Sequence, residues 1–95
     1  MGLGSEQVIV IDIVIKNSLG LHARPASMFV QLASTFDSEI FVEKEGEKVN
    51  GKSLMGLLML AAGCGTILKL QAEGPDSELA LKALVELIDG KFNEE

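Results

Sequence analysis

His22 is the only histidine of the chain, and it lies just before the predicted start of a helix. Pro25 favours the first helical position, and the first backbone amides of a helix lack partners within it and carry positive partial charge. An imidazole nitrogen is a nucleophile, and the guanidinium of Arg24 can pair with phosphate oxygens through two parallel hydrogen bonds. A phosphoryl group on His22 could therefore be held by Arg24 and by the backbone amides of Ala23 and Ala26, which makes these four residues a candidate phosphoryl site.

The alternative is a histidine and an arginine in an ordinary surface loop. Spacing alone favours this alternative, because short motifs match many unrelated proteins. Gly20 lets the loop bend, and Pro25 restricts the backbone, so His22 is expected to be held rather than mobile.

Acidic residues are absent from two long stretches. None of the 14 lies within 17–36 or 48–72, whereas those 45 residues hold Arg24 and three lysines. One face of this acidic protein is therefore expected to be neutral or basic, which suits an anion or an acidic partner. Two buried helices with few charges would produce the same pattern, and both explanations stay open at this point.

Length and composition limit the class of protein. The 95 residues are 47% hydrophobic and 23% charged, as in one globular domain. The chain has one cysteine, Cys64, so it cannot form an internal disulfide, and a small domain without disulfides is typical of the cytoplasm. One cysteine and one histidine cannot build a zinc site unaided, so no metal or cofactor is expected. The net charge of −6 argues against a nucleic-acid partner. The longest apolar run, Leu54 to Leu68, is too short to insert into a membrane.

The first half of the chain predicts a strand, a helix and two further strands. Val8 to Ile15 is rich in β-branched residues, and helical spacing after Pro25 predicts a buried stripe. Ile40 and Val42 alternate with more polar neighbours as in a strand, and a turn at 45–46 leads to a strand over 47–50. The predicted stripe of the first helix consists of Ala26, Phe29, Val30, Ala33 and Phe36.

The second half predicts two more helices around one strand. Ser53 is a candidate N-cap for a helix through Met59, and a strand follows over 66–72. Asp76 or Ser77 caps the last helix. Its predicted inner stripe consists of Leu79 or Ala80, Leu84, Leu87, Ile88 and Phe92. The order is β-α-β-β-α-β-α, which indicates an α+β sandwich with helices on one face of the sheet.

Two segments in register resemble one known family. Residues 21–26, Leu-His-Ala-Arg-Pro-Ala, and residues 49–56, Val-Asn-Gly-Lys-Ser-Leu-Met-Gly, are similar to the active-site motif and the regulatory-serine segment of HPr. HPr is the histidine-containing phosphocarrier of the bacterial phosphoenolpyruvate-dependent sugar phosphotransferase system. The resemblance extends from Val8 to the last helix and implies an HPr-like open-faced sandwich, with a four-stranded antiparallel sheet and three helices on one face.

The resemblance implies a role for each site residue. His22 would accept a phosphoryl group from Enzyme I on Nδ1, as pros-phosphohistidine, and pass it to an Enzyme IIA. Arg24 would steady that group and shift as it arrives. The chain would be a covalent intermediate rather than an independent catalyst. The residues expected to form a docking patch for the partners are Met28, Lys52, Leu54, Met55 and Leu58. For Leu57 and Met59 we expect core positions.

Ser53 has two compatible interpretations. It is expected to cap the second helix, and the resemblance implies regulatory phosphorylation by HPr kinase/phosphorylase. A phosphate there would leave the helix intact and disturb docking of an acidic Enzyme I. Phosphorylated Ser53 could also create a surface for a transcriptional regulator.

Other functions remain as alternatives. One is the carrier of the nitrogen-related phosphotransferase branch, although segment 52–56 favours the sugar carrier. Another is a purely regulatory binding module, which needs Ser53 but not His22, and a third is a ligand-binding domain without chemistry. The presence of His22 argues against the catabolite-repression paralogue of HPr, which lacks that histidine.

The remaining expectations concern the whole chain. Residues 1–95 should form a single HPr-like domain, with 1–7 as a flexible tail. A monomer is expected, because a carrier must expose one face to successive partners. Cys64 lies in a Gly-Cys-Gly segment and is expected in a partly exposed turn without a redox role.

Overall fold

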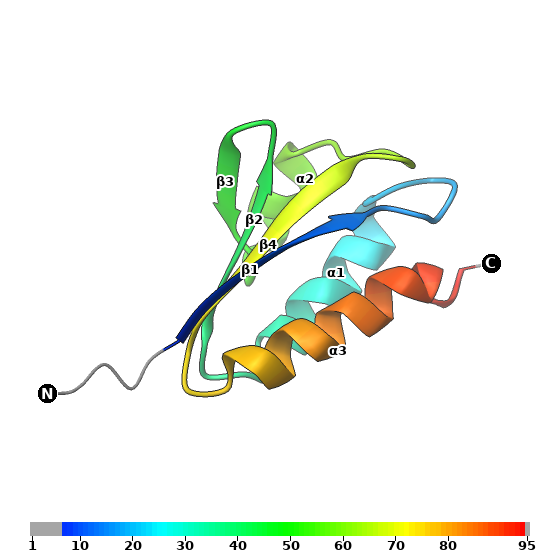
Figure 1. The fold of residues 1–95 in the computed structure, drawn as a ribbon. Coiled ribbons are helices and arrows are strands. Elements are labelled where there is room, and N and C mark those ends of the chain that lie inside the picture. Colours follow the sequence, from blue (N-terminus) through cyan, green and yellow to red (C-terminus); the bar gives the residue numbers. More distant parts are fainter. Residues whose placement is uncertain (1–6, 95) are drawn as a thin grey trace, which may run out of the picture.

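A computed structural model describes residues 7–94, and its elements follow the predicted order. The elements are β1 (Gln7–Val14), α1 (Ala23–Ala33), β2 (Glu39–Lys44), β3 (Glu47–Asn50), α2 (Leu54–Met59), β4 (Ile67–Gly74), α3 (Ser77–Asp89) and the short 3-10 helix η1 (Lys91–Asn93). The strands form one antiparallel sheet in the order β1-β4-β2-β3 (Figure 1). The predicted α+β fold with a four-stranded antiparallel sheet is confirmed.

The two faces of the sheet differ in burial. Along β4 the side chains alternate, so that Leu68 and Leu70 are buried while Ile67 and Lys69 are exposed on the opposite face. The helices α1 and α3 run beside each other along the buried face (Figure 1). Within the described residues, no helix covers the other face of the sheet. The residues that α1 and α2 hold in place therefore lie on the face that the helices cover.

The core is built from the predicted stripes. Phe29 of α1 and Leu84 of α3 are fully or almost fully buried against Val42 and Leu70 of the sheet layer. Burying a side chain of this size stabilises the fold by about 1.5–3 kcal/mol. Phe92 is also fully buried, but it lies in η1 rather than in α3. The core thus reaches past the last helix and anchors the C-terminal segment.

The first helix begins earlier than the sequence predicted. α1 starts at Ala23 with His22 as its N-cap residue, so Pro25 is the third helical residue and not the first. The missing amide of proline costs nothing there, because the first amides of a helix have no intrahelical acceptor. His22 consequently lies at the helix boundary itself.

The other departures are local. Leu79 is exposed and Ala80 is buried, which selects one of the two predicted positions for the inner stripe of α3. Asp76 is the N-cap residue of α3, but its side chain makes no capping bond and instead accepts hydrogen bonds from Asp37 and Ser38. The predicted tail over 1–7 lies outside the described residues except for Gln7, which is the first residue of β1.

Candidate functional site

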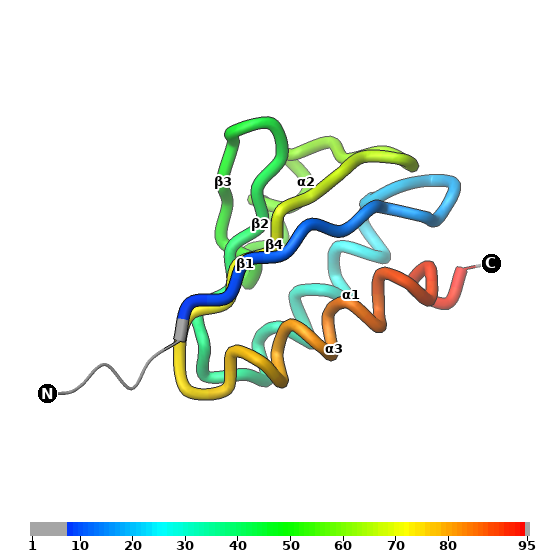
Figure 2. Tube along the Cα trace, viewed as in Figure 1, coloured from blue at the N-terminus to red at the C-terminus, as the bar shows by residue number. Residues whose placement is uncertain are grey.

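The loop before His22 is fixed by contact with the segment after α2. Leu21 donates its amide to the carbonyl of Ala62 at 2.8 Å, and the segments around them run side by side (Figure 2). Gly20 has a φ of +74°, and a Cβ there would lie 2.6 Å from the same carbonyl oxygen. Only glycine satisfies both the backbone angle and the close approach. The position of His22 therefore depends on two segments that are distant in sequence.

The imidazole of His22 contacts an acidic side chain from the other end of the chain. Its Nε2 lies 2.8 Å from Oε2 of Glu94, and the His22 side chain is 39% exposed. An ionised carboxylate only accepts hydrogen bonds, so in the neutral ring Nε2 carries the proton. The lone pair then lies on Nδ1, which is the nitrogen able to attack a phosphorus atom.

Glu94 is itself held by neighbouring donors. Asn17 donates its side-chain amide to Oε1 at 2.9 Å, and an Arg24 nitrogen lies 3.5 Å from Oε2. The hydrogen bond from Asn17 lowers the pKa of Glu94 below its ordinary value, and His22 and Arg24 lower it further against an opposing desolvation effect. Glu94 is therefore ionised at neutral pH and acts as a fixed acceptor.

Arg24 lies beside His22 but faces the C-terminal segment. Its guanidinium donates to the carbonyl of Phe92 at 3.3 Å and approaches Glu94, and its side chain is 56% exposed. Both contacts are long for hydrogen bonds to a guanidinium. A side chain held this weakly can turn toward a new anion beside His22.

The backbone amides of Ala23 and Ala26, both predicted to hold a phosphoryl group, differ in whether they already have a hydrogen-bond acceptor. Ala26 donates its amide to the carbonyl of His22 at 2.9 Å, so it already forms the first hydrogen bond of α1. The expectation that Ala26 is available to a phosphoryl group therefore needs correction. Ala23 is the first residue of α1, a position that has no intrahelical acceptor.

An apolar patch adjoins His22. A hollow of about 270 Å³ is lined by His22 together with Leu19, Leu21, Leu58 and residues 61–63. Leu54 and Met55 extend this patch along α2, where they are 42% and 69% exposed. Exposed apolar side chains grouped in this way commonly mark a surface for protein partners. The docking patch implied by the resemblance is redefined here by exposure: from here on the name means the exposed residues Leu19, Leu54, Met55, Leu58 and Met59, and the docking itself remains a prediction.

The burial predicted for residues in and around α2 had mixed outcomes. Leu57 is fully buried, as predicted, but Met59 is 65% exposed and the core position predicted for it is wrong. The helix is only six residues long, so one buried position is enough to attach it. Met28 is partly buried against the core, and Lys52 donates its ammonium to the carbonyl of Phe36 at 2.8 Å. Neither is a prominent part of the exposed surface.

Ser53 is the N-cap of α2. Its Oγ accepts the amide of Gly56 at 3.0 Å, which confirms the predicted cap. The hydroxyl is partly exposed and is followed directly by Leu54 and Met55. Any group added to this oxygen would therefore lie at the edge of the docking patch.

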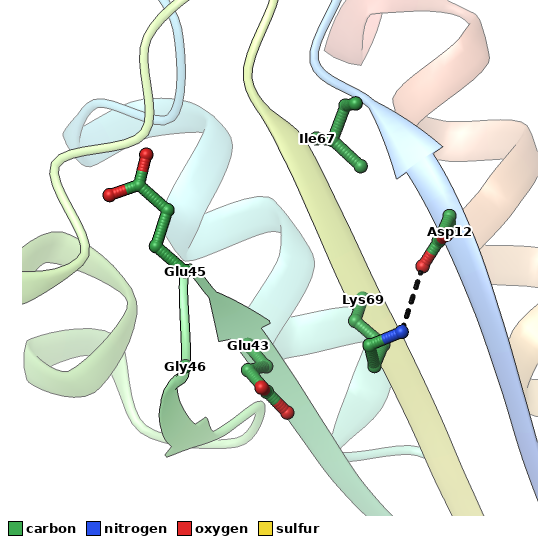
Figure 3. A pocket seen from close by; sticks show the side chains of 6 residues that line it. All are labelled: Asp12, Glu43, Glu45, Gly46, Ile67 and Lys69. Atoms are coloured by element: carbon green, nitrogen blue, oxygen red, sulfur yellow. Dashed lines mark hydrogen bonds and ion pairs between the residues drawn. The ribbon is translucent and has the colours of Figure 1, made fainter.

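A second hollow lies on the open face of the sheet. Lys69 lies 3.3 Å from Asp12, and Glu43 and Glu45 line the same hollow (Figure 3). Three carboxylates against one ammonium leave negative charge, which repels a phosphoryl group. This hollow is also on the face away from α1, so it is separate from the His22 site.

The residues that the structure describes contain neither a candidate metal site nor a candidate membrane span. Within 7–94 no three metal-binding side chains are grouped, and no helix has the length and apolar character needed to cross a membrane. Cys64 is exposed, as predicted for its turn.

Sequence reasoning missed two residues of the site. Asn17 follows the first strand and is completely buried, and Glu94 approaches His22 from 72 positions away. The acid-free stretches had suggested a neutral or basic face, with two buried helices as the alternative, and Glu94 lies outside both stretches. A polar residue in the loop after the first strand was the only sequence signal for Asn17, and nothing in the sequence indicated the contact of Glu94.

Comparison with known proteins shows which family the chain belongs to. The family described as "PTS HPr component phosphorylation site" matches residues 9–90. The phosphocarrier protein HPr of Neisseria meningitidis serogroup A is 52% identical over 83 residues, covering 87% of this chain and 93% of the relative.

Solved structures give the same result. HPr-C-His from Thermoanaerobacter tengcongensis has a TM-score of 0.89 and 56% identity, and the match covers 92% of this chain and 98% of that one. A structure described as an HPr dimer from the same organism has a TM-score of 0.74 and 58% identity, with 86% and 94% covered. The chain therefore belongs to the HPr family of phosphocarrier proteins of the phosphotransferase system.

Proposed function

We propose that this protein accepts a phosphoryl group on Nδ1 of His22 from phospho-Enzyme I and passes it to an Enzyme IIA of the sugar phosphotransferase system. The observation that supports this most directly is the 2.8 Å contact between Nε2 of His22 and Glu94. That contact leaves the lone pair on Nδ1. His22 is also the N-cap residue of α1, where the helix dipole favours an arriving anion.

The transfer is an exchange of one phosphorus–nitrogen bond for another. Nδ1 of His22 attacks the phosphorus of the donor phosphohistidine, and the donor bond breaks with its electron pair returning to the donor ring. Nε2 keeps its proton, so the phosphorylated ring of His22 is positively charged and faces the Glu94 carboxylate. The onward step is the same exchange, with His22 as the leaving group. Positioning and charge, rather than further covalent chemistry, do most of the work.

Arg24 and the start of α1 supply the remaining contacts to the phosphoryl group. Arg24 leaves its long contacts to Phe92 and Glu94 and pairs with the phosphoryl oxygens, because two short parallel hydrogen bonds to an anion are stronger than either long contact. The amide of Ala23 donates to the same oxygens. With one phosphoryl group per His22, the protein is a covalent intermediate and not an independent catalyst.

Partners bind the docking patch in turn. Methionine suits this use because its flexible side chain adapts to different surfaces. Sequential use of one face favours a monomer, and the proposed partners imply a cytoplasmic carrier. A relative described as a dimer shows that the fold can also pair, so the oligomeric state should be measured in solution at the working concentration.

Intact-mass analysis tests the carrier role. Wild type, His22→Ala and Ser53→Ala are incubated with Enzyme I, magnesium and phosphoenolpyruvate. Wild type and Ser53→Ala should each gain one acid-labile phosphoryl group, and His22→Ala none. An unmodified wild type, beside a reference HPr that the same Enzyme I labels, would contradict the proposal.

Ser53 carries a second, regulatory part of the proposal. A phosphate on its Oγ lies at the N-terminus of α2, where the helix tolerates negative charge, and it borders Leu54 and Met55 of the docking patch. Its charge disfavours an acidic partner at that patch. HPr kinase/phosphorylase is the proposed source of this phosphate, and a transcriptional regulator is a candidate reader of it.

Phosphorylated Ser53 can be tested with two substitutions. Ser53→Asp should raise the KM of Enzyme I for this protein about tenfold or more with little change in kcat, whereas Ser53→Asn keeps a capping side chain without the charge and should stay close to wild type. Equal KM values for the two variants would refute the role of charge at this position.

A further inference from the structure

We propose that Asn17 is a positioning residue for phosphoryl transfer at His22, acting on the backbone of His22 through Gly20 and on its ring through Glu94. This inference rests on the proposed carrier function. Asn17 does not touch the imidazole, and it lies in a loop that carries no recognisable motif.

The environment of Asn17 determines how its amide is oriented. The residue is 0% exposed, and its Nδ2 donates to the carbonyl of Gly20 at 2.7 Å and to Oε1 of Glu94 at 2.9 Å. Both neighbours are acceptors, so the NH₂ group and not the oxygen must face them. Its Oδ1 is buried without a hydrogen-bond partner among the described residues. The side chain thus gives up one favourable contact while both of its donors are used, which points to a role for those two donors.

The first donor acts on the backbone of His22. The carbonyl of Gly20 accepts both the amide of Asn17 and the backbone N–H of His22, the latter at 3.0 Å. Gly20 has a φ of +74°, and its conformation directs this carbonyl inward. Asn17 therefore sets the loop conformation that presents His22 at the start of α1.

The second donor acts on the ring of His22. The two carboxylate oxygens of Glu94 have different partners: Oε1 accepts from Asn17, and Oε2 accepts from Nε2 of His22. Because a carboxylate is planar, fixing one oxygen also orients the other. The hydrogen bond from Asn17 is also the largest cause of the lowered pKa of Glu94. One buried amide thereby determines both where His22 is held and which of its nitrogens carries the proton.

An isosteric substitution isolates this effect. Asn17→Asp keeps the shape but places an acceptor against two acceptors, the Gly20 carbonyl and Glu94, and should drive Glu94 away from His22. We expect kcat/KM for transfer from Enzyme I to fall at least tenfold at pH 7. The nitrogen-15 shifts of His22 should change from the tautomer protonated on Nε2 to a mixture of both tautomers. The matched control is Asp89→Asn, which breaks the exposed Lys16–Asp89 ion pair nearby and should leave both readouts unchanged.

A double variant tests whether Asn17 acts through Glu94. In Asn17→Asp combined with Glu94→Gln, the new amide at position 94 can donate to the carboxylate introduced at position 17, while its oxygen accepts from Nε2 of His22. The double variant should therefore recover part of the transfer rate that Asn17→Asp loses. Losses that simply add would overturn the proposed coupling.

A final comparison guards against misfolding of Asn17→Asp. Asn17→Ser removes both hydrogen bonds without adding a charge, because its hydroxyl oxygen stands where Cγ of Asn17 stood, one bond short of both acceptors, so a smaller loss of rate than in Asn17→Asp is expected. Transfer within twofold of wild type, with the Nε2-protonated tautomer kept, in a folded variant would overturn the proposal. Failure of the carrier function itself would look different, because wild type would then receive no phosphoryl group at all.

Discussion

Glu94 and His22 are 72 positions apart in the sequence, yet Oε2 of Glu94 lies 2.8 Å from Nε2 of His22. The contact exists because Phe92 is buried in the core and carries the C-terminal segment back to the start of α1. A carboxylate at this place has two effects. It keeps the proton on Nε2, and in the proposed transfer it would offset the positive charge that the ring acquires on phosphorylation at Nδ1.

Glu94→Gln should slow phosphoryl transfer without unfolding the protein. The NH₂ group of Asn17 still needs an oxygen opposite it, so the new amide turns its own NH₂ group toward Nε2, which favours the tautomer protonated on Nδ1, and it carries no charge. We expect kcat/KM with Enzyme I to fall about tenfold, which corresponds to about 1.4 kcal/mol. Steady-state transfer assays with Glu86→Gln, an exposed position on α3, as the control would measure this, and equal rates for the two variants would rule out the role of Glu94.

Gly20→Ala should destabilise the fold and displace His22. The new Cβ would lie 2.6 Å from the oxygen of Ala62, and the residue would keep a positive φ. Together these effects should lower the free energy of unfolding by about 2 kcal/mol or more. Gly63→Ala is the matched control, because a Cβ there meets open space, and it should change stability by less than about 0.5 kcal/mol. Urea denaturation of both variants measures these changes, and an equal free energy of unfolding for the two variants would contradict the prediction.

Met55→Ser should weaken partner binding and leave the chemistry intact. Met55 is 69% exposed in the docking patch, and its burial against Enzyme I would contribute about 1.5 kcal/mol, or roughly tenfold in KM. Leu79→Ser is the control, since Leu79 is 65% exposed but belongs to α3 and not to the docking patch. A rise in KM for both variants, or for neither, would argue against docking at α2.

Asp76→Asn should remove a pH-dependent contribution to stability. The hydroxyl of Ser38 and the amide of Asp37 lower the pKa of Asp76 below its ordinary value. A carboxyl group with a lowered pKa stabilises the fold above its unfolded pKa of about 3.9, and this contribution disappears as the pH falls through the folded value. Wild type should therefore be more stable than Asp76→Asn at pH 7, and the difference should shrink below about pH 4. Thermal unfolding of both proteins from pH 7 to pH 3 measures the difference, and a constant gap would contradict the assignment.

The order of elements could be predicted from the sequence because it follows from local patterns. Alternation in β4, helical spacing in α1 and α3, and the Ser53 cap depend on neighbours within a few positions. The predictions that failed involved competition between local preference and packing. Met59 is apolar yet exposed, because the short helix α2 needs only Leu57 to attach it to the core. Pro25 lies two positions inside α1, because His22 and not proline forms the helix boundary.

The sequence by itself determined that His22 and Arg24 lie together at the start of a helix, since both are local to one segment. It also determined the four-stranded α+β architecture and its likeness to HPr. Only the tertiary structure decided that the site contains a carboxylate and a buried amide. Glu94 lies 2.8 Å from His22 and accepts a 2.9 Å hydrogen bond from Asn17, although Glu94 is more than 70 positions from both. Such contacts depend on how β1, α1 and η1 pack in three dimensions. The periodicity or spacing of residues within one element cannot predict them.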